Sequence, residues 1–147
     1  MFVRGKANDG LKQGIETCVK MFRKANYINI VAGTLDPIFY NNEKIKAVLE
    51  EKIKAGTKIE IITGPDYNSE VVKKLKKRAF GIKYYTLDEY PPKHFMVTDK
   101  YVRMEETHEK GTKERKAIFV YGGEARVISN IAERKFKELK NKAIPLN

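Results

Sequence analysis

Helix and strand patterns alternate along the first 87 residues of this chain, and that alternation constrains its fold more than any other feature. Residues 9–25 place apolar side chains at three- and four-residue steps, which is typical of a helix with one buried face. Strand patterns follow at residues 27–33, 58–64 and 82–87, with a helix-length segment between each pair. Because such crossovers allow parallel pairing, we expect these three strands to lie parallel in one sheet.

Capping residues mark where the two intervening helices begin and end. Asn41 or Asn42 can cap the second helix, and Gly56 is suited to end it. Asn68 or Ser69 can cap the third helix in the same way. Both helices carry an apolar stripe at helical spacing, so we expect each to pack one face against the sheet.

The second part of the chain changes style. Apolar runs at 94–99, 100–106 and 116–123 follow one another with no helix-length segment between them, which indicates strands. The last two are joined by a charged loop and predict an antiparallel hairpin. Residues 124–142 predict a closing helix, and we expect Pro145 to end the regular structure. The whole pattern predicts a single α/β domain, a mixed β-sheet flanked by helices.

The charge balance and the single cysteine bound the possible partners and compartment. Thirty Lys and Arg residues against 19 Asp and Glu give a formal net charge of +11. This surplus favours polyanions such as nucleic acid, but abundant lysine and glutamate is also typical of thermophile proteins. No apolar run approaches the roughly 20 residues of a membrane span, and the start lacks a secretory pattern. Cys18 predicts an inert core thiol, and we expect a cytoplasmic protein.

Two loops are expected at the carboxyl ends of the parallel strands, where open α/β sheets bind ligands. Residues 33–37 and 64–68 each begin with glycine, and they offer the Thr34 hydroxyl and the Asp66 carboxylate to a ligand. The same residue types also build ordinary turns, so both interpretations stay open. Neither loop has the glycine-rich run into Lys-Ser or Lys-Thr of a P-loop.

The stretch YPPKHFMVTDKYVRM, from Tyr90 to Met104, contains the residue types of phosphate chemistry: His94, Asp99 and Arg103. Three interpretations of His94 stay open: a half-buried residue with a local partner, a ligand of phosphate or another anion, or a nucleophile. Arg103 is a candidate for anion contact. The histidines, acids and single cysteine show no metal-ligand spacing, so we expect no metal and no cofactor.

The order of these segments resembles the phospholipase D superfamily. The resemblance rests on the strand at 59–64, a short helix, the strand at 82–87, and a proline-marked turn into a strand that ends at Asp99. Residues 52–63 look like the family's basic helix end, glycine turn and apolar strand. Residues 134–143 are similar to the closing helix of non-catalytic members, such as the phospholipase D-like domains of archaeal transcription regulators.

The resemblance implies a catalytic signature, H-x-K-x4-D, that this chain carries only in degenerate form. In the family the histidine is the nucleophile, the lysine holds phosphate oxygens, and single-motif chains dimerise to build one site. Aligning Asp99 with the family aspartate puts Pro92 in the histidine place and His94 in the lysine place. Aligning His94 with the nucleophile puts Met96 and Tyr101 in the other two places. Either register loses at least two of the three catalytic groups, including the lysine cation that the transition state needs, so we expect binding without turnover.

The sequence therefore predicts one non-catalytic phospholipase D-like domain over residues 1–147 that binds an anionic ligand or nucleic acid as a regulatory or accessory module. A homodimer and a nucleic acid or phosphate-containing ligand are the expected partners. The predicted ligand-binding residues are Thr34, Asp66, His94, Asp99 and Arg103. The alternative is a phosphodiesterase or nuclease with a rearranged active site in which His94 is the nucleophile. Basic runs on the third and last helices are either solvated faces or contacts to nucleic acid.

Overall fold

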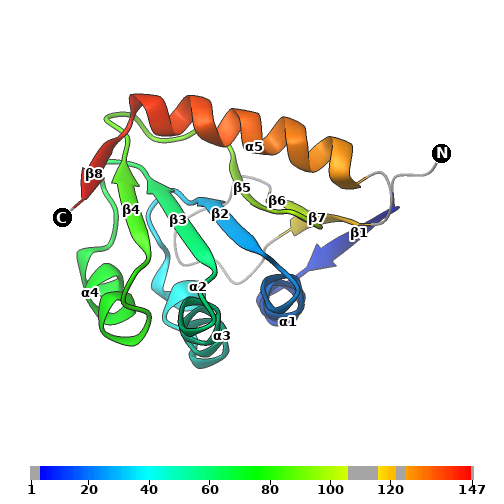
Figure 1. Ribbon diagram of the computed structural model, residues 1–147, viewed down its shortest axis with the longest axis horizontal. Coiled ribbons are helices and arrows are strands. Elements are labelled where there is room, and N and C mark those ends of the chain that lie inside the picture. Colours follow the sequence, from blue (N-terminus) through cyan, green and yellow to red (C-terminus); the bar gives the residue numbers. More distant parts are fainter. Residues whose placement is uncertain (1–3, 106–115, 122–124, 147) are drawn as a thin grey trace.

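The computed structural model describes residues 4–105, 116–121 and 125–146, which form a mixed α/β fold (Figure 1). In chain order its elements are β1 (Arg4–Asp9), α1 (Leu11–Arg23), β2 (Tyr27–Val31), α2 (Pro37–Tyr40), α3 (Glu43–Lys54), β3 (Lys58–Thr63), α4 (Ser69–Arg78), β4 (Lys83–Thr86), β5 (His94–Thr98), β6 (Val102–Glu105), β7 (Lys116–Tyr121), α5 (Ala125–Lys142) and β8 (Ile144–Leu146).

One sheet holds all the described strands, in the order β1-β7-β6-β5-β2-β3-β4-β8. The strands β2, β3 and β4 are parallel, as the alternating pattern predicts, and the other neighbours are antiparallel. In the sheet centre Ile30 pairs with Ile61 of β3 on one side and with Met96 of β5 on the other. These central strands are apolar on both faces because helices cover both faces.

The helices are divided unequally between the two faces of the sheet. Figure 1 shows α1, α2, α3 and α4 on one face and α5 alone across the other. The larger core lies under the first group and includes Phe22, Ile30 and Leu49. A smaller core under α5 includes Val97 and Phe136. The predicted mixed sheet flanked by helices is confirmed.

Cys18 lies in the larger core, as predicted. Its side chain is fully buried, and its thiol donates a hydrogen bond to the sulfur of Met96 at 3.6 Å. Burial raises the pKa of the Cys18 thiol to about 11, because the thiolate would lose its hydration there. The thiol therefore stays protonated at neutral pH.

The structure decides between the alternative helix caps. Asn42 caps α3, where its side-chain oxygen accepts from the backbone N–H of Lys44 at 2.9 Å. Asn68 caps α4 in the same way and accepts from Glu70 at 3.1 Å. Gly56 follows α3 with a φ of 88°, the left-handed conformation that suits glycine after a helix.

Three short elements were missed by the sequence prediction. The strand Arg4–Asp9 lacks an apolar run, and it pairs only with β7 at the sheet edge. The single-turn helix Pro37–Tyr40 begins at the last residue of the predicted loop 33–37 and precedes the predicted cap at Asn41 or Asn42. Pro145 does not end the regular structure, since it lies inside β8 and pairs with Tyr85. Proline has no backbone N–H to donate. It is tolerated here because β8 is an edge strand, and the outer side of an edge strand has no neighbouring strand to bond.

The second part of the chain forms the predicted hairpin. The strands β6 and β7 are antiparallel, with Val102 opposite Val120 and Met104 opposite Ile118. The predicted charged connection, which contains His108, lies outside the described residues. None of the described helices combines the length and the apolar character needed to cross a membrane.

Two polar contacts hold α5 to the sheet. The buried carboxylate of Glu60 on β3 accepts from the Lys140 ammonium at 2.7 Å and from the Tyr85 hydroxyl at 2.9 Å. Near the middle of the helix, the Tyr27 hydroxyl donates to Glu133 at 2.8 Å. The orientation of α5 across the strands is thus fixed by side chains as well as by its apolar stripe.

Candidate functional site

Two loops, one strand start and one strand end meet at the carboxyl edge of the parallel strands. Residues 33–36 leave β2 there, and residues 64–68 leave β3. Because β5 runs antiparallel to β2, its first residue, His94, lies at the same edge, and so does Glu105 at the end of β6. The two loops are tied by backbone hydrogen bonds from Gly64 to Gly33 at 2.9 Å and from Asn68 to Thr34 at 2.7 Å.

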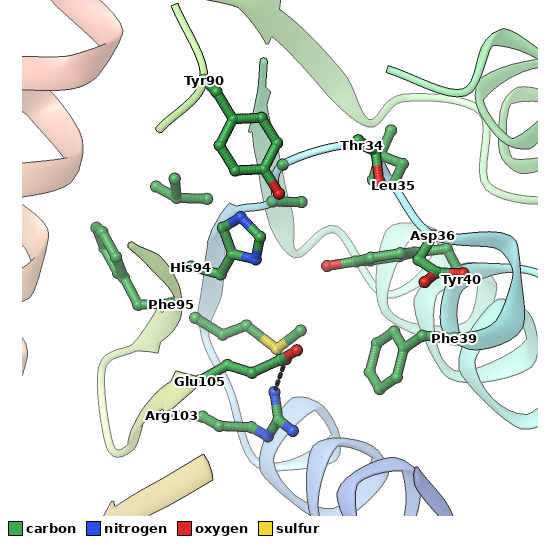
Figure 2. A pocket seen from close by; sticks show the side chains of 14 residues that line it. Thr34, Leu35, Asp36, Phe39, Tyr40, Tyr90, His94, Phe95, Arg103 and Glu105 are labelled. Carbon is green, nitrogen blue, oxygen red and sulfur yellow. Dashed lines mark hydrogen bonds and ion pairs between the residues drawn. The ribbon is translucent and has the colours of Figure 1, made fainter. Parts of the chain in front are cut away.

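A small pocket of about 50 Å³ lies at this edge, on the face covered by α1 to α4. Figure 2 shows His94 between the ring of Tyr90 and the Arg103–Glu105 pair, with α2 forming the facing wall. A pocket of this volume holds a few atoms, comparable to one or two water molecules. Polar side chains from five separate segments nevertheless converge on it, whereas a packing defect in a core is lined by apolar groups.

The floor of the pocket is a buried ion pair. Arg103 is 1% exposed, and its Nη1 lies 2.8 Å from a carboxylate oxygen of Glu105. The guanidinium also lies over the ring of Phe39, with 6.0 Å between its central carbon and the ring centroid. Within the described residues, Nε of Arg103 finds no hydrogen-bond partner. The cation is therefore largely committed to Glu105.

Tyr90 closes the pocket against the backbone of Gly33. A Cβ at Gly33 would lie 2.6 Å from Nε2 of His94 and closer still to the hydroxyl of Tyr90. Both side chains thus rest directly on the glycine, and their ring centroids are 5.5 Å apart. Glycine at this position follows from the close approach and not from the backbone conformation.

Three carboxylates act on the Tyr90 hydroxyl at the pocket. Burial, and then the charges of Asp66, Glu105 and Asp36, raise the pKa of the Tyr90 hydroxyl above its usual value. Negative groups have this effect because they disfavour the phenolate. Three carboxylates therefore act on the Tyr90 hydroxyl, while Arg103, the one arginine among the described lining residues, is paired with Glu105.

The structure brings three of the five predicted site residues to this pocket. Thr34, His94 and Arg103 line it, and Asp66 acts on Tyr90 from the neighbouring loop. Asp99 does not share the pocket. It lies at the other end of β5, about 16 Å along the strand at about 3.3 Å per residue.

Asp99 instead joins two turns at the opposite ends of the strands, where β2 begins and β5 ends. Its carboxylate accepts from the backbone N–H of Asn26 at 2.8 Å and from the Asn26 side chain at 2.7 Å. Next to it, the Lys100 ammonium donates to the carbonyl of Lys24 at 2.7 Å. Asp99 is engaged in fixing the start of β2, which is a local structural contact.

Several pocket residues were not predicted from the sequence. Asp36 is buried and caps α2 through the backbone N–H of Ile38 at 3.0 Å. Leu35, also buried, has a φ of 58°, a conformation uncommon for a bulky side chain and often found near functional sites. The partner of Arg103 could have been found, since Glu105 is two residues further along the same strand and hence on the same face.

Solved structures of other proteins share this fold. The archaeal chromatin protein TrmBL2, whose structure shows a novel mode of DNA binding, superimposes with a TM-score of 0.73 at 14% identity. The alignment covers 97% of this chain but 54% of TrmBL2, so the chain spans about half of that protein. Nuc from Salmonella typhimurium, a phospholipase D family member, gives a TM-score of 0.72 at 12% identity over 98% of this chain and 99% of Nuc.

This chain has the phospholipase D-like fold. Polyphosphate kinase from Porphyromonas gingivalis contains the same fold, with a TM-score of 0.67 at 10% identity over 98% of this chain and 27% of the kinase. No protein-family model matches the sequence, and no curated protein matches it. At these identities the likeness concerns the fold alone.

The pocket contains no lysine among its described lining residues. Lys93, the nearest lysine in sequence to His94, lines a groove on the α5 side instead. Two residues after His94, Met96 lines the pocket on the same strand face. His94 therefore has no ammonium group beside it from its own strand.

The second candidate surface is the basic face of α4. Lys74 and Lys77 are exposed, and within the described structure neither forms an ion pair. Immediately after the helix, Phe80 is 86% exposed. An aromatic ring beside free ammonium groups is the arrangement that proteins use to stack nucleic-acid bases.

The other cations of α4 are partly committed to protein groups. Lys73 pairs with Glu70 at 3.4 Å, and Arg78 pairs with Glu43 at 2.9 Å and with a second glutamate of α3. Lys76 lies over the ring of Tyr84 at 5.8 Å. Fewer cations of α4 are therefore available to a ligand than the sequence suggests. Within the described structure, Lys74 and Lys77 remain without an ion pair, and the exposed Phe80 follows Lys77 by three residues.

Proposed function

We propose that this chain is a non-catalytic phospholipase D-like domain that binds nucleic acid as a regulatory or accessory module. The observation that carries the proposal is the exposed ring of Phe80, three residues after Lys77 in the sequence, together with Lys74 and Lys77, which form no ion pair within the described structure. A phenylalanine that is 86% exposed leaves its apolar surface in water unless a ligand covers it. Stacking of a base on the ring and contact of phosphates with the ammonium groups would satisfy both features.

The likeness to TrmBL2 supports this choice of ligand. TrmBL2 is a DNA-binding protein with the same fold, and the net charge of +11 favours a polyanion. Because the identity is 14%, the likeness supports a class of ligand and no particular contact.

The charges of the edge pocket support the choice of the outer surface over the pocket. Asp36, Asp66 and Glu105 act together on Tyr90, and Glu105 neutralises Arg103. A phosphate entering the pocket would meet more carboxylates than free cations. We therefore place the polyanion on α4 and regard the predicted anion site of Thr34, Asp66, His94, Asp99 and Arg103 as the less favoured position.

The absence of turnover also belongs to the proposal. A phosphodiester transition state needs a nucleophile and a cation placed against the non-bridging oxygens. Among the described residues of the pocket, His94 is the one histidine, and the one cation, Arg103, is held by Glu105. This arrangement supports binding without hydrolysis.

Fluorescence anisotropy with a labelled 20-nucleotide single strand tests the binding. Phe80→Ala should weaken binding about tenfold, since stacking contributes about 1–3 kcal/mol per base. Lys74→Gln with Lys77→Gln should weaken it and also reduce the slope of log affinity against log salt. Lys12→Gln, an exposed lysine on α1, is the matched control and should change little.

Two results would contradict the proposal. Binding that is equal in Phe80→Ala, Lys74→Gln and Lys12→Gln would place the nucleic acid elsewhere. Hydrolysis of bis-p-nitrophenyl phosphate that His94→Ala abolishes would replace the binding role by the phosphodiesterase alternative. The predicted homodimer stays part of the proposal, and sedimentation equilibrium measures it.

A further inference from the structure

A groove of about 670 Å³ lies on the face of the sheet that α5 covers. Its floor is formed by Phe95 and Val102, and its walls are α5 and the loop 87–93. Figure 1 shows α5 as the one described helix on this face, lying across the strands. Such a helix covers about 10–12 Å of strand length, whereas a strand of five residues is about 16 Å long. One helix therefore leaves part of this face uncovered, and the groove lies beside it.

Four large apolar side chains stand exposed next to the groove. Met104 and Ile118 lie opposite each other on β6 and β7, and they are 43% and 52% exposed. Val127 and Ile131 are one helical turn apart on α5, and they are 56% and 60% exposed. Because Met104 and Ile131 also line the groove, these side chains continue its apolar lining outward. Exposed apolar surface of this extent on a folded chain marks an interaction surface.

The charges that line the groove balance. Lys135 pairs with Glu138 at 3.8 Å. Within the described structure the other charged lining residues form no ion pair, and they are Lys93, Lys142, Asp88 and Glu89. The chain as a whole carries +11, so two copies repel each other over most of their surface. At the groove a second copy of this basic chain meets no excess of like charge.

A hollow and exposed apolar side chains on the same face suit a two-fold contact. In a two-fold dimer one surface faces a copy of itself, so side chains that stand out from one copy must fit a hollow of the other. Val127 and Ile131 can enter the groove of a second copy while that copy's own pair enters the first groove. With Val127 and Ile118, the described lining also comes close to the roughly 20–30 residues that each side of a standard interface contributes.

We propose that the groove and the apolar side chains beside it form the interface between two copies of this chain. Each copy places Val127 and Ile131 in the groove of the other. The exposed Arg126 and Arg134, which lie next to them on α5, face the carboxylates of the second copy's loop 87–93. The inference rests on the homodimer of the proposed function and assigns a surface to it. It does not involve the nucleic-acid site, because α4 lies on the opposite face of the sheet and stays uncovered in both copies.

Sedimentation equilibrium of Ile131→Glu tests the apolar contact. Two-fold symmetry buries the new carboxylate twice, so the dimer dissociation constant should rise about tenfold for each copy and about a hundredfold in all. Ile144→Glu is the matched control, because Ile144 is 66% exposed and lies in β8 at the sheet edge beyond β4. The control should stay within about twofold of the parent chain. Circular dichroism should be unchanged in both variants, since both side chains are exposed.

The balance of charges is tested by Glu89→Lys. This change gives the interface an excess of like charge, so it should weaken the dimer about five- to tenfold at low salt and less at high salt, where screening is stronger. Glu16→Lys makes the same change in net charge at an exposed position of α1, on the other face of the sheet, and should change little. Equal effects of the two substitutions would contradict the placement.

The outcomes separate the interface from the rest of the proposed function. A dimer that persists unweakened in Ile131→Glu overturns this interface and leaves the homodimer in place. A parent chain that sediments as a monomer at about 100 μM overturns both the interface and the homodimer. Nucleic-acid binding is judged in either case by the Phe80 and Lys74 variants, whose side chains lie outside the interface.

Discussion

Breaking the buried Arg103–Glu105 pair gives the most direct test of the candidate site. The two charged groups are 2.8 Å apart, with side chains 2% and 9% exposed. Glu105→Gln keeps the shape and a carbonyl acceptor but leaves a guanidinium that is only 2% exposed without its counter-charge. Removing one partner of a buried pair costs about 3–5 kcal/mol, and the retained acceptor places the expected loss near the lower end, about 3 kcal/mol.

Urea denaturation followed by circular dichroism measures this loss. In a domain of this size about 3 kcal/mol also lowers the melting temperature by about 6–12 °C. Glu138→Gln is the matched control, because Glu138 forms an ion pair with Lys135 at 3.8 Å between side chains that are both more than half exposed. An exposed pair contributes about 0–1 kcal/mol, so the control should remain close to the parent protein.

A double-substitution cycle completes the test. Arg103→Met with Glu105→Gln removes both charges, so its loss should be smaller than the sum of the two single losses by about 2 kcal/mol. If Glu105→Gln lowers the free energy of unfolding no more than Glu138→Gln, with an unchanged m-value, the pair is not desolvated. The description of the pocket floor as a committed cation would then be wrong.

Three further predictions follow from other contacts. Gly33→Ala should destabilise the chain by about 1–3 kcal/mol through overpacking. The loss should be smaller in a Tyr90→Ala background, because that change removes two of the three closest contacts of the added methyl group. Equal losses in denaturant titrations of both backgrounds would contradict this prediction. Burial opposes ionisation of Glu60, but the hydrogen bonds from Lys140 and then from a tyrosine lower its pKa below the usual 4.5. The stabilising contribution of the Glu60 carboxylate is therefore present above that pH and is lost as the pH falls below it. Unfolding titrations across pH should show a weaker acid dependence of stability in Glu60→Gln. The Cys18 thiol, with a pKa of about 11 and full burial, should react with a thiol reagent at pH 8 only after unfolding, and rapid labelling of the native chain would show that its helix opens.

Much of the fold could be predicted because the long elements carry periodic signals. The helix α3 has its cap, its stripe and its terminal glycine in the sequence, and β2 and β3 alternate with helices in the order that a parallel sheet requires. The strand β1 could not be found in this way, because RGKAND has no apolar period and owes its conformation to pairing with β7. The tertiary partner, and not local propensity, decides such edge strands.

The candidate site was predicted in part for a similar reason. Thr34 and His94 follow from strand ends and loop positions, which the sequence indicates. The separation of Asp99 from His94 follows from the length of β5, since a strand of five residues holds its two ends far apart. Only the side-chain geometry showed that Arg103 is paired with Glu105 and is therefore not free to bind an anion.

The sequence by itself determined the class of fold, the loss of the histidine–lysine pairing and the positive net charge, because these depend on periodicity and on which residues are present. The tertiary structure alone decided that Arg103 is paired with Glu105, that carboxylates outnumber free cations among the described residues at the carboxyl ends of the parallel strands, and that a groove lies along α5. These features depend on where side chains from distant segments point, and a local pattern carries no information about a partner sixty residues away.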